Sequence, residues 1–439
     1  MILNYGFSIT GKSHLKRNIV CQDSHKIKKM DNGWVIAAVA DGVGSAINSH
    51  IGSKIAVETV VAFCEECMPY DYNVISIKSM MRTAYNYALK CIYREAEKTG
   101  NPVESYDTTL TMVIYDGQRI IYGHSGDGAI LGLTQYGNYV EITSPQKGAD
   151  LVSVLPLRAG YTQWVIDSYE EDLVAVLLVT DGMLETICPY LLKFGDGSIY
   201  VPLAMFFSDP YCVDSDEAID NIYQFLLAED EYEKDKFYNS IGMALYKHIV
   251  DQARVNEIYE RIKNTNYPVV FMKSEQDDKT VVGLINADAE LENQEVSYYD
   301  EPDWHKLQDM WNRRAYPHLY QEEKLSESDN ADDLSESVDD HESDKDNNES
   351  REQEPEAEKR VIQNEDKREI DIPCGVNKKS SDASINTEKE NSANIRQSNI
   401  KYSERNGEKI LPPRHRQPRK RGITNRILDK IQDVIDGEQ

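Results

Sequence analysis

The sequence has no long hydrophobic run. No apolar stretch approaches the roughly 18 residues that a membrane-spanning helix needs. The opening residues, MILNYGFSIT, lack the basic segment and apolar core of a signal peptide. Cysteines are also few: the seven in 439 residues are odd in number and scattered, which is typical of reduced thiols. We therefore expect a cytoplasmic protein that does not act at a membrane.

The sequence is also short of paired cysteines and of basic residues, and these two shortages exclude further classes of function. Cys64 and Cys67 form a C-x-x-C pair, but no second pair follows at the spacing of a zinc site. Positive charge is in deficit, with 48 basic against 76 acidic residues and a net charge of −28. This charge opposes general affinity for nucleic acid or anionic lipid. Aromatic and aliphatic residues gather in roughly the first two-thirds of the chain, which is enough for a sizeable core.

The most informative stretch is Trp34–Ser45, which reads WVIAAVADGVGS. Its seven leading apolar residues predict a strand that is buried on both faces. The strand ends at Asp41-Gly42, where a rigid element would hold the carboxylate and glycine would let a ligand approach. Asp-Gly is also a common turn dipeptide, so a simple strand end is the alternative.

The pattern of a strand followed by an aspartate recurs later in the chain. The apolar run Leu173–Thr180 ends in Asp181-Gly182, and further acidic positions are Asp127 in GHSGDG, Asp277 in QDDKT and Asp23 in CQD. Carboxylates suit Mg²⁺ or Mn²⁺ as ligands, whereas no cluster of histidine and cysteine indicates zinc. From these residues alone, turn residues are the more ordinary interpretation and a metal site is the alternative.

Apolar spacing predicts the other elements. We expect helices over residues 51–67, 74–98, 217–227 and 241–262. We expect strands over residues 4–10, 108–115, 119–124, 129–134, 269–272 and 281–285. Residues 11–18 read as a polar loop that contains His14. Consecutive helices after a strand pair are typical of a helical layer laid against a sheet.

Four motifs, taken together, resemble those of a known family. They are VADGVGS at 39–45, GHSGDGA at 123–129, VTDG at 179–182 and DDKTVV at 277–282. In this order they are similar to the metal-site motifs of the PPM/PP2C protein serine/threonine phosphatases, and the opening SH…CQD resembles the bacterial branch. The resemblance covers about residues 5–287. It implies an α+β fold, a β-sandwich of two antiparallel sheets flanked by helical layers, with metals at one end.

The same resemblance implies the residues that hold the metals, which would be Mn²⁺ or Mg²⁺. The set comprises Asp41, Gly42 through its carbonyl, Asp181, Asp277, Asp127 and Asp23. In it Asp41 bridges two ions, and Asp127 with Asp181 holds a third, looser ion. A metal-activated water then attacks phosphoserine or phosphothreonine in a protein substrate, which a serine/threonine kinase would have phosphorylated. No phosphoenzyme forms.

Three departures from the family pattern affect this expectation. Gln22 stands where a glutamate ligand is usual, Asn18 replaces a phosphate-binding arginine, and Val43 replaces a histidine of eukaryotic members. The alternative function is therefore a catalytically degenerate fold that acts as a sensor or scaffold. His14 completes the catalytic set of Asp41, Asp181 and Asp277 if it contacts phosphate or protonates the leaving oxygen; a merely exposed loop histidine is the other interpretation. His124 has a structural or a functional role.

Composition divides the chain into three parts: the phosphatase domain at 1–290, a disordered acidic and polar linker at 291–411, and a terminal element at 412–439. The terminal element joins a basic block, PPRHRQPRKRG, to a short amphipathic helix that begins near Thr424. Its apolar face fits the groove of a docking partner, and a solvated tail is the alternative. Binding to nucleic acid is the lesser option, because the chain is acidic.

Overall fold

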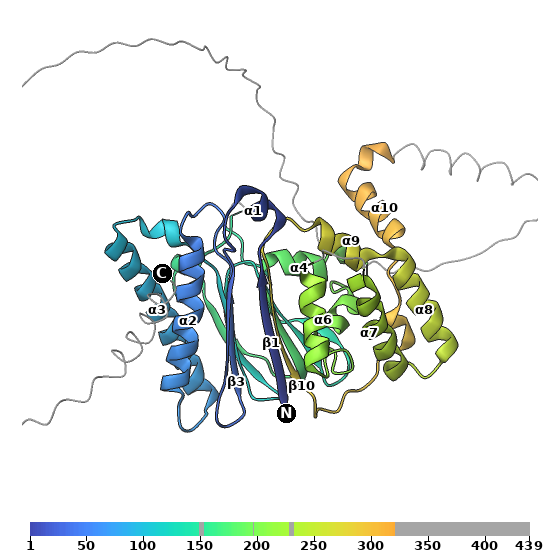
Figure 1. The fold of residues 1–439 in the computed structure, drawn as a ribbon, viewed down its shortest axis with the longest axis horizontal. Coiled ribbons are helices and arrows are strands. Elements are labelled where there is room, and N and C mark those ends of the chain that lie inside the picture. The colour runs from blue at the N-terminus through green and yellow to red at the C-terminus, as the bar shows by residue number, and fades with distance from the viewer. Residues whose placement is uncertain (149–152, 196, 228–231, 321–439) are drawn as a thin grey trace, which may run out of the picture. The chain divides into compact units, whose positions relative to one another are not determined.

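Two five-stranded antiparallel sheets form the centre of the computed structural model, which describes residues 1–148, 153–195, 197–227 and 232–320. The first sheet has the order β1 (Ile2–Ile9), β10 (Lys279–Asn286), β9 (Leu173–Val179), β6 (Ala129–Thr134) and β7 (Tyr139–Glu141). The second has the order β2 (Ser24–Lys29), β3 (Val35–Ala40), β4 (Leu110–Tyr115), β5 (Ile120–Ser125) and β8 (Val165–Ser168). Figure 1 shows the sheets between helices.

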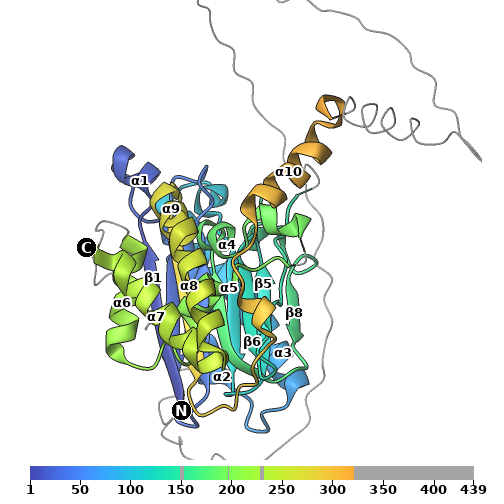
Figure 2. The same ribbon diagram turned by 90° about the vertical axis from the view of Figure 1, so that its right-hand side faces the viewer.

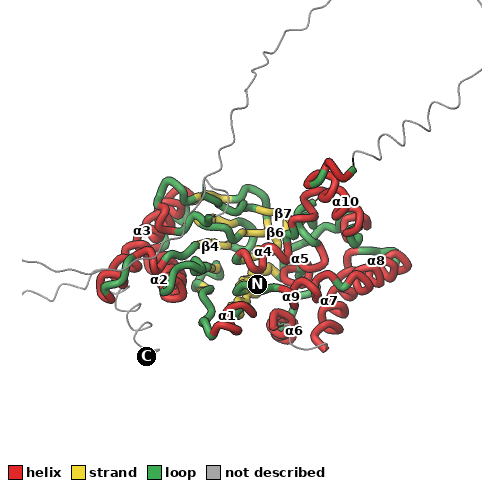
Figure 3. Tube along the Cα trace, turned by 90° about the horizontal axis from the view of Figure 1, so that it is seen from above, coloured by secondary structure: helices red, strands yellow, loops and turns green. Residues whose placement is uncertain are grey.

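Helices cover the outer face of each sheet. The second sheet carries α2 (Ser49–Cys67) and α3 (Val74–Thr99). The first carries a larger group, namely α4 (Asp181–Ile187), α5 (Val201–Ser208), α6 (Asp216–Leu227), α7 (Tyr232–His248), α8 (Gln252–Thr265) and α9 (Tyr267–Ser274). Figure 3 shows these two helical groups on opposite sides of the strands, and in Figure 2 the larger group lies in front of the strands. The expected α-β-β-α sandwich is confirmed.

The central strand β3 explains why the sheets pack on both faces. Successive side chains on a strand point to opposite faces, so its apolar run serves two cores. Val35, Ala37 and Val39 lie in the core between the sheets. Ile36, Ala38 and Ala40 lie in the core shared with α2 and α3. The uninterrupted apolar run therefore marks a strand enclosed on both sides, as expected.

The loop predicted over residues 11–18 is wrong, because the structure has a short helix there, α1 (Lys12–Arg17). The helix ends at Asn18, which takes the left-handed conformation with φ 54°. It is tied to the rest of the molecule by the N–H of Ser13, which donates to the carbonyl of Gln276 at 2.9 Å. A helix this short shows no apolar periodicity, so the pattern could not indicate it.

Two other predictions over the helical region are wrong. The single helix expected over residues 241–262 is split, because the Asp251 side chain accepts hydrogen bonds from Ala253 and Arg254 and starts α8. The strand expected over residues 269–272 belongs to helix α9. The β-branched pair there resembles a strand, but the preceding Pro268 suits the first turn of a helix.

The chain continues past β10 as a packed segment, residues 291–320. It contains the helical turn η4 (Val296–Tyr299), α10 (Trp304–Ala315) and the turn η5 (Pro317–Leu319). Tyr299 and Leu307 are buried in the core of α4 to α9, and the Trp304 ring stacks on Tyr267 with centroids 4.1 Å apart. Packed structure thus extends beyond the boundary expected at residue 290. The tail beyond 320, with its expected linker and terminal helix, lies outside the described residues.

Within the described ranges, no helix is long and apolar enough to cross a membrane. The six cysteines found there are free thiols, and Cys64 and Cys67 lie in α2, as the helical pattern predicts.

Candidate metal centre

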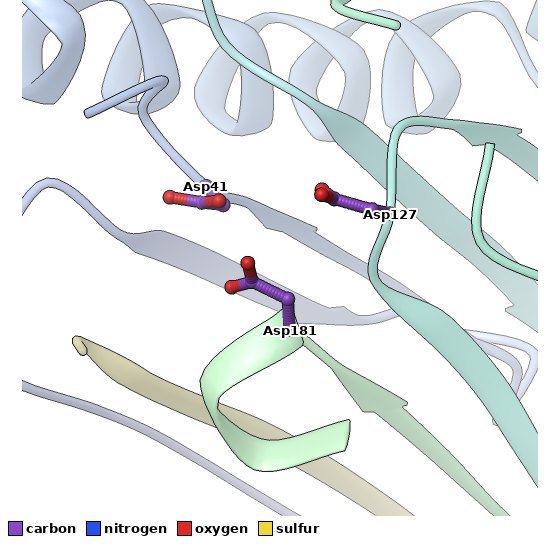
Figure 4. A group of neighbouring side chains, drawn as sticks. All are labelled: Asp41, Asp127 and Asp181. Carbon is purple, nitrogen blue, oxygen red and sulfur yellow. The ribbon is translucent and has the colours of Figure 1, made fainter. Parts of the chain in front are cut away.

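Three carboxylates from separate parts of the sequence meet at one end of the sandwich. Asp41 follows β3, Asp127 lies in the turn between β5 and β6, and Asp181 begins α4 directly after β9. One ligand atom from each lies within 4.8 Å of the others. Figure 4 shows the three side chains pointing toward one another. Such an arrangement of oxygen donors suits a hard divalent cation.

Backbone contacts hold Asp41 and its neighbours in place. The N–H of Asp41 donates to Thr109 Oγ1 at 2.8 Å, and Thr108 Oγ1 donates to the Asp41 carbonyl at 2.8 Å. Gly42 must be a glycine, because a Cβ there would lie 2.7 Å from Cβ of Ser49. Its N–H donates to the Gln22 carbonyl at 3.2 Å. These contacts place the Asp41-Gly42 corner beside the loop that carries Gln22.

The glycine after Asp181 has an equally strict role. A Cβ on Gly182 would lie 2.3 Å from the Asp278 carbonyl oxygen, so only glycine lets α4 begin this close to the loop before β10. The N–H of Gly182 also donates to Asp181 Oδ1 at 2.8 Å, which orients that carboxylate. The glycine of this Asp-Gly dipeptide is therefore required by packing.

Asp23 joins the cluster from the loop before β2. Its carboxyl accepts a hydrogen bond from Thr180 Oγ1 at 2.8 Å, and its negative charge acts on Asp41. Burial raises the pKa of Asp23 to about 7. Burial, and then the charges of Asp127 and Asp277, raise the pKa of Asp181 to about 8. The pKa of Asp41 is also raised, by burial and then by the charges of Asp23 and Asp181.

These observations fit divalent cations. Carboxylates whose pKa values are raised by burial and by mutual repulsion are stabilised in the charged form when cations lie between them. Two side-chain oxygens of the site, Asp127 Oδ1 and Gln22 Oε1, are buried and have no hydrogen-bond donor among the described residues. Both belong to side chains less than a tenth exposed. Buried acceptors of this kind cost free energy unless a donor or an ion satisfies them.

The two aspartates before β10, Asp277 and Asp278, have different surroundings. Asp277 is exposed and is not one of the three aspartates whose ligand atoms converge, although its charge acts on Asp181. Its Oδ1 accepts a hydrogen bond from the Asp278 N–H at 2.9 Å. The motif analysis missed Asp278, which is 2% exposed. Its carboxylate accepts from the N–H of Gly11 at 2.7 Å and of Gln22 at 2.6 Å, and it contacts His14 Nδ1 at 2.9 Å. The doubled aspartate was the only signal for this role.

His14 and His124 are both buried, so neither is an exposed loop histidine. His14 is 6% exposed and is held by Asp278 at the edge of the cluster. His124 is fully enclosed in β5, with Nδ1 2.9 Å from Thr111 Oγ1, and burial lowers its pKa to about 4. The lowered pKa keeps this enclosed ring neutral near pH 7. Asn18, at the expected arginine position, is exposed at the end of α1.

Lys147 is a second residue that the sequence did not indicate. Its Nζ lies 2.6 Å from Asp127 Oδ2 and forms an ion pair with it. Burial lowers the pKa of Lys147, but the hydrogen bond and charge of Asp127 outweigh this effect and raise the pKa above its ordinary value. No motif contains this lysine, because it lies in the loop after β7, 20 residues from Asp127.

The family model described as protein phosphatase 2C matches residues 10–232, more than half of the 439 residues. The protein is thus of the protein serine/threonine phosphatase class. In particular, the chain belongs to the protein phosphatase 2C family, as its motifs predicted. A search of curated protein sequences found no match.

Solved structures with a similar fold include bacterial phosphatases. The S. agalactiae serine/threonine phosphatase is 15% identical, with 65% of this chain and 99% of that chain covered and a TM-score of 0.39. The catalytic domain of PstP in complex with 2 manganese ions is 16% identical, with 65% and 97% covered and a TM-score of 0.36. PppA of Pseudomonas aeruginosa has the same four values as PstP. The family assignment rests on the sequence match to residues 10–232.

Proposed function

We propose that this protein hydrolyses phosphoserine and phosphothreonine in proteins with the help of Mn²⁺ or Mg²⁺. The observation that carries the proposal is the convergence of Asp41, Asp127 and Asp181, whose ligand atoms lie within 4.8 Å of one another. The family supplies the reaction class, and the buried Oε1 of Gln22, which has no hydrogen-bond donor among the described residues, supports an ion as its missing partner.

In this proposal two divalent ions would be held by Asp41, the Gly42 carbonyl, Asp181 and Asp277. When bound, a pair of divalent ions lowers the pKa of a water and stabilises the charge that develops on a phosphoryl group. Asp23, which accepts a hydrogen bond from Thr180 Oγ1, adds its negative charge beside Asp41. The family resemblance implies a position for a further cation at Asp127 and Asp181.

We assign His14 to the leaving group. Asp278 engages Nδ1 of the imidazole, so Nε2 is the nitrogen left to exchange a proton with the serine or threonine oxygen. Because Asp278 also holds the backbone of Gln22, the acid and the metal site share one anchor. The substrate is a phosphorylated protein, and the enzyme that supplies it is a serine/threonine kinase.

The test is hydrolysis of p-nitrophenyl phosphate and of a phosphothreonine peptide by the full-length chain. We expect turnover with added Mn²⁺ and none with EDTA, because the water nucleophile depends on the ion. Asp181→Asn should lower kcat/KM by about a hundredfold or more, since it removes a charged ligand.

Asp167→Asn is the matched control, because Asp167 is an exposed aspartate in β8 and forms an ion pair with Lys78 of α3. It should keep the wild-type rate. Undiminished turnover by a folded Asp181→Asn variant would contradict the metal site. Absence of turnover by the wild type with either ion and either substrate would favour the degenerate scaffold.

A further inference from the structure

Lys147 puts a positive charge inside the carboxylate cluster. Its Nζ is 2.6 Å from Asp127 Oδ2, and the Asp127 side chain is 8% exposed. The ammonium group also experiences the negative charges of Asp181 and Glu185. Lys147 itself keeps 38% of its side-chain surface exposed, so it reaches the cluster from the solvent side. The charge of the lysine therefore acts where Asp127 and Asp181 approach each other.

Backbone pairing fixes the position of this lysine. The N–H of Gln146 donates to the Gly126 carbonyl at 2.7 Å, and the Gln146 side chain accepts from the Gly126 N–H at 3.2 Å. Gly126 is the residue before Asp127. Lys147 then pairs with Val154 in a short antiparallel bridge. The loop is thus attached to the turn that carries Asp127, and the next side chain along it meets that carboxylate.

The glycine at this attachment is required by the geometry. Gly126 has φ +126°, and a Cβ there would lie 2.4 Å from Cβ of Thr109. Thr109 in turn holds the backbone of Asp41. The same turn therefore sets the positions of Asp41, Asp127 and Lys147. The lysine is built into the site rather than laid on its surface.

We propose that the Lys147 ammonium group takes the place of a divalent cation at the Asp127–Asp181 position. The inference rests on the proposed function, because it assumes that Asp41, Asp181 and Asp277 hold the other ions. A fixed single charge neutralises Asp127 at every metal concentration, whereas an exchangeable ion does so only when it is bound. Lys147 is thus a positioning residue that sets how many ions the site takes.

The test is equilibrium binding of Mn²⁺ to the full-length chain, measured by calorimetry and by metal analysis after dialysis. Lys147→Gln removes the charge and should bind one more Mn²⁺ per chain than the wild type. Its added site should have an affinity at least about tenfold above any weak binding in the wild type, because a repelling charge a few ångströms away is gone. Adding Asp127→Asn to this variant should abolish the extra ion.

Two controls separate charge from disturbance of the loop. Lys147→Arg keeps the charge and should match the wild-type stoichiometry. Lys78→Gln removes a lysine from a different ion pair with an aspartate, Asp167, and should also match the wild type.

Three outcomes overturn the inference. Equal stoichiometry in the wild type and Lys147→Gln would show that Lys147 holds no cation position. A higher KM for phosphopeptide in Lys147→Gln, with unchanged metal binding, would instead make the lysine a phosphate contact. Absence of Mn²⁺ binding by the wild type and by every variant would overturn the proposed function, and this inference with it. The first two outcomes, by contrast, overturn the inference alone.

Discussion

At the scale of single residues, the site combines buried aspartates with a neutral glutamine, Gln22. Asp41 and Asp181 have raised pKa values because they are buried together, whereas Gln22 contributes a neutral amide where the family has a carboxylate. The Gln22 backbone is held on both sides, by Asp278 at its N–H and by Ser53 at its carbonyl. Its side-chain Oε1 is buried and, within the described chain, has no donor. We therefore expect the amide either to act as a weak neutral ligand or to hold a water at the metal.

Gln22→Glu should tighten binding of Mn²⁺ by about tenfold, because an added carboxylate stabilises a nearby divalent ion. Calorimetric titration of the metal-free protein measures this change. Gln118→Glu is the matched control, since it adds the same charge on the exposed turn between β4 and β5. An unchanged titration for Gln22→Glu would place residue 22 outside the metal's ligands.

At the scale of elements, one buried histidine joins three segments. His248 ends α7, with Nε2 2.6 Å from Asp209 Oδ2 after α5 and Nδ1 2.9 Å from Asn293 Oδ1 after β10. Its ring also stacks on Tyr299 with centroids 5.2 Å apart. Burial lowers the pKa of His248, but the hydrogen bond and charge of Asp209 outweigh it and raise the pKa above 6.5. The protonated histidine is thus the stabilising form.

This ion pair predicts a pH dependence of stability. A histidine with a raised pKa in the folded state stabilises fully below its unfolded pKa and loses that contribution as the pH rises through the folded value. As the pH rises from about 6.5 through the raised pKa of His248, the wild type should therefore lose unfolding free energy relative to His248→Gln. At about pH 6 the substitution should cost about 3 kcal/mol.

Urea unfolding, with Mn²⁺ present throughout so that the site carboxylates stay neutralised, measures both effects. His305→Gln on the exposed side of α10 is the control and should follow the wild type. Parallel pH curves for the wild type and His248→Gln would show that the pair carries no protonation-linked stability.

At the scale of the whole molecule, the segment 291–320 belongs energetically to the folded domain. Glu301 is 4% exposed and accepts hydrogen bonds from Tyr200 and from Trp304, both at 2.7 Å. Tyr299 and Leu307 are buried in the same core. Removal of these side chains would leave a cavity over α8 and α9. We therefore propose that the domain ends near residue 320 rather than near 290.

Two truncations test this boundary. A chain ending at Ala289 should lose roughly 4 kcal/mol of unfolding free energy, because several buried aromatic and aliphatic side chains are removed. A chain ending at Tyr320 should keep the full-length stability and the full-length rate on p-nitrophenyl phosphate. Thermal melts and initial rates measure these outcomes.

Equal stability of the two shortened chains would return the boundary to residue 290. A large rise in rate on removal of residues 321–439 would mean that the acidic tail inhibits the enzyme. A rate that stays equal leaves the tail as a docking element, which is the role we expect for it.

The sequence by itself determined the order of the motifs and indicated seven of the ten described strands, but it did not indicate the less buried strands β2, β7 and β8. These signals are local: an apolar run such as Val35–Ala40 and the aspartate that follows it are neighbours in the chain. The family resemblance then related four separate aspartates to one site. Elements without a local signal were missed, since α1 has little apolar pattern and α9 resembles a strand.

Tertiary structure alone decided which polar groups surround the aspartates. Asp278 and His14 are 264 residues apart in sequence, and nothing in either motif indicates that they touch. Lys147 reaches Asp127 only because Gln146 pairs with Gly126 across the loop. Such contacts depend on how the sheets and loops pack, since a charged side chain on a loop has no periodicity that would reveal its partner.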